Sequence, residues 1–319
     1  MADAKFFKQM PVDWDLRQDG ADFSGVAGMR YPFQMVPAGG TRSCQISVSG
    51  GMARVRVGNP QIARIASDPG RPPVDALTFN TSGSFSIIGG RAGTTYVIAE
   101  EPGGIMPARL HLLNVYVKDE VKVRYNLARL SDPVNTTTSM SLAEAEKILT
   151  NVEALYLSQT NVRLIKQQMK ELHVGRILSD NNNVIQLDVM SNNMEDVIFA
   201  EIRSQGLSNA DVVFVFTWNI EGSRDLVQTT GRPLDGRTET PERFARYRNS
   251  SRSGPTVIYI NSFGSAGFHH TLTTAHELGH HFGLSHFAPR PSNYLMEAGG
   301  NRGFKMSWGD INGVNRTGI

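Results

Sequence analysis

The sequence predicts two domains: an all-β sandwich at residues 25–118, after a polar lead-in at 1–24, and an α/β domain at 119–319. From about residue 30 to residue 118, short segments alternate apolar and polar residues between turns rich in Gly and Pro, as in antiparallel sandwiches. After residue 119, some segments repeat apolar residues at helical spacing and others are almost entirely apolar, which indicates helices beside a buried sheet. A chain of 319 residues is long enough for two separate cores.

The first domain is expected to consist of short strands with no residues that suggest chemistry. The clearest strands are predicted at 45–48, 53–57, 84–88, 94–99 and 110–117. Cys44 is the only cysteine, which excludes an intramolecular disulfide, and we interpret it as a small residue within a strand.

The second domain is expected to alternate strands and helices. Ser141 and Glu144 form a capping box, because each can satisfy a free amide at a helix start, and apolar residues then recur at helical spacing as far as Tyr156. The other predicted elements are strands at 120–129, 162–172, 211–217 and 256–261, a helix at 195–205, and a solvated loop with five arginines at 236–254.

Residues 276–286 read His-Glu-Leu-Gly-His-His-Phe-Gly-Leu-Ser-His and carry the predicted chemistry. On a helix, His276 and His280 are four residues apart, so their imidazoles share one face and can bind one metal ion. Glu277 lies one residue further round the helix, where it can reach a water on that metal without being a ligand. His281 points about 100° away from its neighbour His280, and we interpret it as structural or exposed.

A third ligand requires the helix to end. His286 would lie about 9 Å further along a straight helix, at ~1.5 Å per residue, and on the wrong face. Gly283 resolves this because glycine readily adopts the left-handed conformation that ends helices, which lets His286 turn back under the metal. Three neutral imidazoles with one open position predict one catalytic Zn²⁺, whereas the sequence contains no recognisable calcium loop.

The pattern H-E-x-x-H-x-x-G-x-x-H, followed by Met296 in Ser-Asn-Tyr-Leu-Met, resembles the zinc signature and Met-turn of the metzincin metallopeptidases. The resemblance implies that Met296 supports the floor of the metal site and that 225–233 is either an edge strand that pairs with substrate or a surface loop. Phe287 and Ala298 match none of the variants that define subfamilies, so we assign no subfamily.

The first domain carries a weaker resemblance. Residues 57–63 and 89–95 are similar to two conserved segments of bacterial immunoglobulin-like domains of group 2. Together the two resemblances imply an immunoglobulin-like sandwich followed by an α/β metzincin-type protease domain. Many secreted animal metzincins are stapled by disulfides, which a chain with one cysteine cannot form, so a bacterial source is favoured.

The resemblance to metzincins implies a zinc endopeptidase acting on protein or peptide substrates. In that mechanism the metal activates a water, and Glu277 takes the proton of this water as the general base. Two alternatives stay open: a binding or adhesion protein whose metal site is vestigial, and a delivered protease effector or toxin with one dedicated substrate.

Composition excludes several other classes. The net charge of +2 gives no support for a nucleic-acid partner, and no stretch approaches the ~20 apolar residues of a membrane span. The N-terminus has no apolar run long enough for a signal peptide. Three placements stay open: export by a non-classical route, a sequence trimmed of its signal, and a location inside the cell, of which the first two are favoured.

Overall fold

The computed structural model describes residues 2–7, 21–22, 32–103, 107–131, 140–174, 185–186, 194–217, 220–221, 236–239, 254–261, 268–286, 294–297, 303, 306, 310 and 313–314. The chain forms two compact units. The first consists of Met1–Val121, Leu155–Val162 and His286–Ile319, and the second consists of Lys122–Ala154 and Arg163–Ser285. The domain boundaries predicted from the sequence, after residues 24 and 118, stay predictions.

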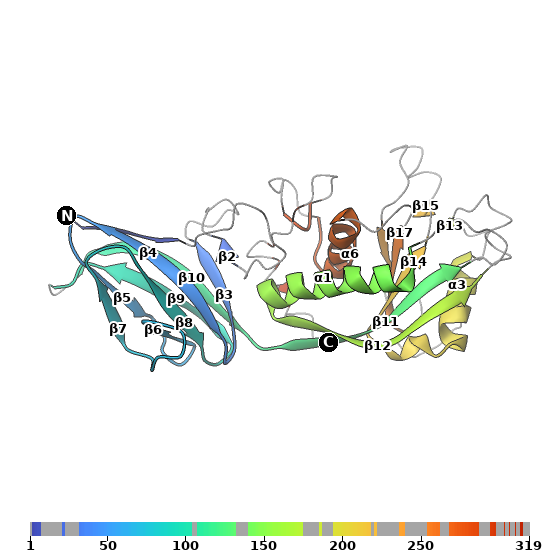
Figure 1. Ribbon diagram of the computed structural model, residues 1–319, viewed down its shortest axis with the longest axis horizontal. Helices are drawn as coiled ribbons and strands as arrows, with labels where there is room; N and C mark the ends of the chain where they lie inside the picture. The colour runs from blue at the N-terminus through green and yellow to red at the C-terminus, as the bar shows by residue number, and fades with distance from the viewer. Residues whose placement is uncertain are drawn as a thin grey trace. The chain divides into compact units, whose positions relative to one another are not determined.

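The first unit contains two β-sheets (Figure 1). The four-stranded sheet has the order β1-β4-β8-β6, and the six-stranded sheet has the order β2-β3-β10-β9-β5-β7. Strands β3 and β10 pair in parallel, and the other neighbouring strands pair antiparallel. The strands are β1 (Asp3–Phe7), β2 (Ala21–Asp22), β3 (Phe33–Pro37), β4 (Thr41–Ser49), β5 (Ala53–Val57), β6 (Ala63–Ala66), β7 (Ala76–Phe79), β8 (Gly83–Gly89), β9 (Gly93–Glu100) and β10 (Arg109–Lys118).

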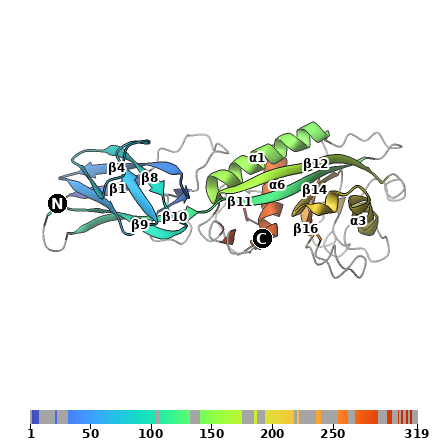
Figure 2. The ribbon, with the colours of Figure 1, turned by 90° about the horizontal axis from the view of Figure 1, so that it is seen from below.

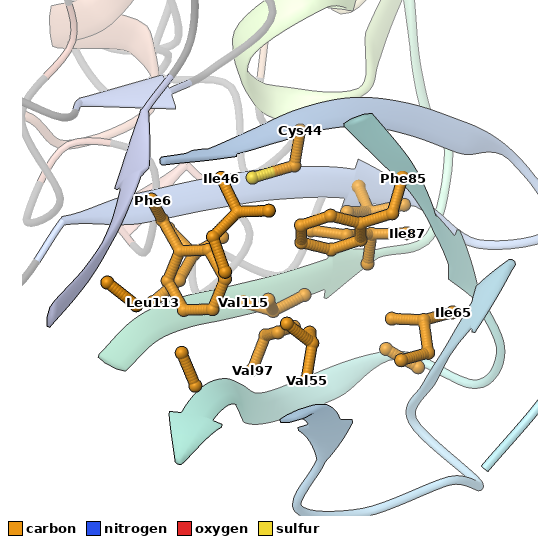
Figure 3. Close-up of a cluster of buried hydrophobic side chains, with 14 of the residues drawn as sticks. Phe6, Cys44, Ile46, Val55, Ile65, Phe85, Ile87, Val97, Leu113 and Val115 are labelled. Carbon is orange, nitrogen blue, oxygen red and sulfur yellow. The ribbon is translucent and has the colours of Figure 1, made fainter. Parts of the chain in front are cut away.

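Alternate residues from both sheets form one buried apolar core (Figure 3). Cys44 is completely buried in this core on β4, so the interpretation of this cysteine as a small strand residue is confirmed. The predicted polar lead-in is wrong at its start. Residues Asp3–Phe7 form β1, which pairs antiparallel with β4 and buries Phe6 in the same core.

The second unit is built on a five-stranded sheet with the order β12-β11-β14-β17-β16. Strands β11, β14 and β17 run parallel, whereas β16 is antiparallel to β17. The elements that follow β10 in the chain are β11 (Val121–Ser131), α1 (Leu142–Thr160), β12 (Val162–His173), β13 (Ile185–Gln186), α3 (Met194–Ser204), η1 (Leu207–Asn209), β14 (Val212–Thr217), β15 (Ile220–Glu221), β16 (Gly236–Glu239), β17 (Thr256–Asn261) and α6 (Phe268–His281).

The central strand β14 is buried along its whole length, as its apolar sequence predicts. Its residues Val213 and Val215 belong to a core that also contains residues of α3. On the opposite face of the strand, Phe214 packs edge-on against Tyr125 of β11, with ring centroids 5.7 Å apart. Helix α6, drawn in orange, lies against β16 and β17 (Figures 1 and 2). The sheet therefore provides a rigid base for α6.

The first turn of α1 confirms the predicted capping box. The backbone amide of Ser141 donates to Glu144 Oε2 at 2.8 Å, and the amide of Glu144 donates to Ser141 Oγ at 3.2 Å. The hydroxyl of Ser141 also donates to Glu144 Oε2, at 2.7 Å, and this bond together with the one from the Ser141 amide holds the pKa of Glu144 below its ordinary value. None of the described helices is both long enough and apolar enough to cross a membrane.

The predicted fold class is wrong and needs correction. The sequence predicted an immunoglobulin-like sandwich followed by an α/β metzincin-type domain. The described residues are instead mostly β, with 49% of them in strands and 24% in helices, and they form three main sheets. The physical reason is that part of the strand content depends on pairing between segments distant in the sequence. Strands β1 and β16, which the sequence did not predict, form by pairing with β4 and β17.

The prediction of a loop at 236–254 is also wrong for its first residues. Residues Gly236–Glu239 form the edge strand β16, and the positions 240–253 lie outside the described residues. The possible edge strand at 225–233 lies outside them as well.

Candidate metal centre

Helix α6 ends in the turn that the sequence predicts at Gly283. Gly283 adopts a left-handed conformation with φ of +75°. Its amide donates to the carbonyl of His280 at 2.9 Å, and the amide of Leu284 donates to the carbonyl of Gly279 at 3.0 Å. These two bonds form a Schellman motif, which satisfies the last carbonyls of the helix and reverses the chain.

The turn is followed by the third histidine of the pattern. The ligand nitrogens of His276, His280 and His286 all lie within 4.8 Å of one another. Nitrogen ligands about 2.0–2.1 Å from a tetrahedral zinc are themselves about 3.4 Å apart, so the nitrogens must come closer by up to about 1.4 Å to bind one ion. Within the described residues, these histidines make up the group that can hold a metal ion.

The tautomer of His280 is set by the same turn. Its Nδ1 lies 2.7 Å from the carbonyl oxygen of Leu284, so Nδ1–H donates to this carbonyl and the lone pair is left on Nε2. The rings of His276 and His280 stand at 90° with centroids 4.8 Å apart, as expected for residues four apart on one helix face. A backbone carbonyl behind a histidine is the usual way in which proteins orient an imidazole ligand.

Glu277 is buried and has a defined partner on β16. Glu277 is only 6% exposed to solvent. The hydroxyl of Thr238 lies 2.9 Å from Glu277 Oε2 and 2.8 Å from the backbone carbonyl oxygen of Glu277. Gly236 lies against the same side chain: a Cβ on Gly236 would be 2.8 Å from Glu277 Cγ. The carboxylate next to the first histidine is therefore enclosed by the edge strand.

His281 has a structural role, as one of its two sequence interpretations predicts. Its Nδ1 lies 2.8 Å from Thr256 Oγ1 at the start of β17, and its Nε2 is buried without a hydrogen-bond partner in the described part of the chain. Burial lowers the pKa of His281 to about 4, against a smaller opposing effect of the Asp211 charge. The neutral ring thus ties the end of α6 to the sheet.

Other residues near the pattern in the sequence lie as follows. His269 is exposed and His270 half-buried in the first turn of α6, and neither belongs to the group that can hold a metal. Met296 is completely buried in the turn Tyr294–Glu297, and its role beneath the metal stays a prediction. Phe287 and Ala298 lie outside the described residues.

Sequence reasoning missed Thr238 and Gly236. Both lie in a polar stretch of four residues, Gly-Arg-Thr-Glu, which lacks the alternation of apolar and polar residues that indicates a strand. Thr238 is 39 positions away from Glu277 in the chain. Only the pairing of β16 with β17 brings it to the helix, and no signal in the sequence reports that pairing.

Comparison with known proteins identifies no family. No protein-family model matches the chain, and no curated protein matches it. Among solved structures, it is similar to domains 4 and 5 of the S-layer protein SbsC, with 12% identity and a TM-score of 0.19, over 26% of this chain and 45% of that one. Domains 5–6 of the same S-layer protein give 14% identity and a TM-score of 0.19, over 26% of this chain and 38% of that one.

A third similar structure is WR4, an MSP family member of C. elegans, with 13% identity and a TM-score of 0.19 over 27% of this chain and 91% of that one. The chain spans less than half of either S-layer structure. At this TM-score the likenesses support no conclusion about function, and they give no support to the fold class expected from the sequence. What is shown is that His276, His280 and His286 can hold a metal ion.

Proposed function

We propose that this chain is a zinc-dependent endopeptidase in which His276, His280 and His286 bind the metal and Glu277 is the general base. The observation that carries the proposal is the clustering of three imidazole nitrogens within 4.8 Å, directly beside a buried glutamate. The resemblance of 276–286 to the metzincin zinc signature supports the same activity.

The residues present fit zinc. Imidazole is a preferred ligand of Zn²⁺, and three imidazoles without a fourth protein ligand are typical of catalytic sites. His280 already has its Nδ1 occupied by the Leu284 carbonyl, which leaves Nε2 for the metal. When bound, zinc would lower the pKa of a coordinated water to about 7 and polarise the carbonyl of the scissile peptide.

Glu277 performs the proton transfers in this proposal. Its carboxylate accepts the proton of the attacking water and then delivers it to the nitrogen of the leaving amine. A general base must be held within hydrogen-bond reach of the water that it deprotonates. Burial of Glu277 and its bond to Thr238 restrict the carboxylate to few conformations.

The edge of the sheet favours an extended peptide as substrate. Strand β16 ends the five-stranded sheet, and no strand in the described part of the chain pairs with its outer edge. Such an edge can add an extended peptide through backbone hydrogen bonds. Because Thr238 of this strand contacts Glu277, a peptide paired there would run beside the base.

Cleavage of a diverse peptide mixture tests the proposed function. We expect new cuts, measured by mass spectrometry, that disappear with a zinc chelator and return when zinc is restored. Cuts that persist at full rate with the chelator would refute a zinc mechanism. Zinc bound at one per chain without any cuts in the mixture or in intact proteins would refute a general endopeptidase and leave the protease with one dedicated substrate or the binding protein.

A further inference from the structure

Strand β16 presents two residues to the same side chain of α6. Gly236 and Thr238 are two positions apart in a strand, so they point to the same face of the sheet. Both lie against Glu277: Thr238 through its hydroxyl, and Gly236 through the space that its missing side chain leaves. The strand is held in place by pairing with β17, where Gly236 is opposite Ile260 and Thr238 is opposite Ile258.

The hydroxyl of Thr238 is the polar part of this contact. It has one hydrogen to donate, and both nearby acceptors belong to Glu277: Oε2 at 2.9 Å and the backbone carbonyl oxygen at 2.8 Å. Donation to an ionised carboxylate is roughly twice as strong as donation to a neutral acceptor. The arrangement therefore fixes the carboxylate relative to the backbone of its own residue.

Gly236 is the steric part of the contact. A Cβ at this position would be 2.8 Å from Glu277 Cγ, 2.8 Å from Thr273 Cγ2 and 3.3 Å from Glu277 Oε1. Gly236 does not belong to the glycines with positive φ, so backbone conformation does not call for glycine here. Glycine is needed here for space, because a Cβ at position 236 would be too close to both Glu277 and Thr273, so these side chains or the strand must shift.

We infer that Thr238 and Gly236 are positioning residues for the general base, with the hydroxyl of Thr238 orienting the Glu277 carboxylate and Gly236 providing the space that it fills. This inference rests on the proposed function, since it assigns Glu277 the role of base. It makes β16 part of the catalytic apparatus in addition to its place in the sheet.

Three substitutions separate this role from a structural one. Thr238→Val keeps the shape and removes the hydroxyl, Thr238→Ser keeps the hydroxyl, and Gly236→Ala adds the Cβ. The control is Thr150→Val on α1, which removes a hydroxyl that donates to the Glu146 carbonyl at 3.0 Å. Each protein is loaded with zinc, and its zinc content and unfolding midpoint are measured before kinetics on a cleaved peptide.

We expect Thr238→Val to lower kcat roughly 10- to 100-fold, as for loss of one hydrogen bond to a charged group, with KM within about twofold of the parent value. Thr238→Ser should restore most of kcat, Gly236→Ala should lower it, and Thr150→Val should leave it unchanged. A parental kcat in Thr238→Val, or equal losses in Thr238→Ser and Thr238→Val, would overturn the inference.

Crystal structures of the zinc-loaded parent and of Thr238→Val give a readout that does not need activity. We expect the Glu277 carboxylate to move away from its parental position in the variant. An unmoved carboxylate would overturn the inference even if the parent cleaves peptides. A parent that cleaves nothing refutes the proposed function instead, and the two structures then decide separately whether Thr238 holds Glu277.

Discussion

Replacement of Glu277 by glutamine should abolish peptide cleavage while the protein keeps one zinc per chain. Glutamine has almost the same shape as glutamate but cannot accept the proton of the attacking water. General-base catalysis contributes typically 10²- to 10⁴-fold, so we expect kcat/KM to fall by about that factor. The zinc content should not change, because the three histidines and not Glu277 form the group that can hold a metal.

Glu171→Gln is a matched control for this variant. Glu171 lies on β12 and pairs with Arg129 at 2.7 Å, so the change removes a carboxylate of the same type from a surface ion pair. Exposed pairs of this kind contribute little to stability, and we expect the parental rate. If Glu277→Gln cleaved peptides as fast as Glu171→Gln does, Glu277 would not be the base.

Replacement of Gly283 by valine should weaken zinc binding more than replacement by asparagine. A β-branched residue at φ of +75° is strained by about 1–3 kcal/mol, whereas asparagine tolerates the left-handed conformation. Gly283 closes the turn that carries the Leu284 carbonyl to His280 and leads to His286, so relief of the strain disturbs two of the three ligands.

The measurement is the dissociation constant for zinc, obtained by competition with a chelator of known affinity. We expect Gly283→Val to bind roughly ten- to a hundredfold more weakly than the parent, at about 1.4 kcal/mol per factor of ten, and Gly283→Asn to lie close to the parent. Gly39→Val is a control, because Gly39 also has positive φ, at +72°, but lies in the first unit after β3. Equal affinities for all four proteins would show that the turn does not shape the site.

The metal-binding stretch could be predicted because its geometry is local. The spacing of His276 and His280 follows from helix periodicity, and glycine at position 283 follows from the conformation that ends a helix. Strand β14 could also be predicted from the sequence, because an apolar run of that length is typical of a strand buried on both faces.

Features that depend on contacts distant in sequence could not be predicted. Strand β1 was read as a polar lead-in because only Ala4 and Phe6 turn inward, and its identity as a strand comes from pairing with β4. Strand β16 is short and polar, and its pairing with β17 defines it. The predicted fold class was wrong for a related reason. The motif at 276–286 defines a site, but so short a stretch does not determine how many strands the rest of the chain forms.

The most direct test of the metal site is a count of zinc ions bound per chain, by native mass spectrometry, in the parent and in His286→Ala. His286 is the ligand that local helix geometry alone does not place, so it separates a three-histidine site from a helix with two surface histidines. We expect one zinc per parent chain and none in the variant at the same free zinc concentration. No zinc on the parent, or the same affinity in both proteins, would contradict the site and the proposed function together.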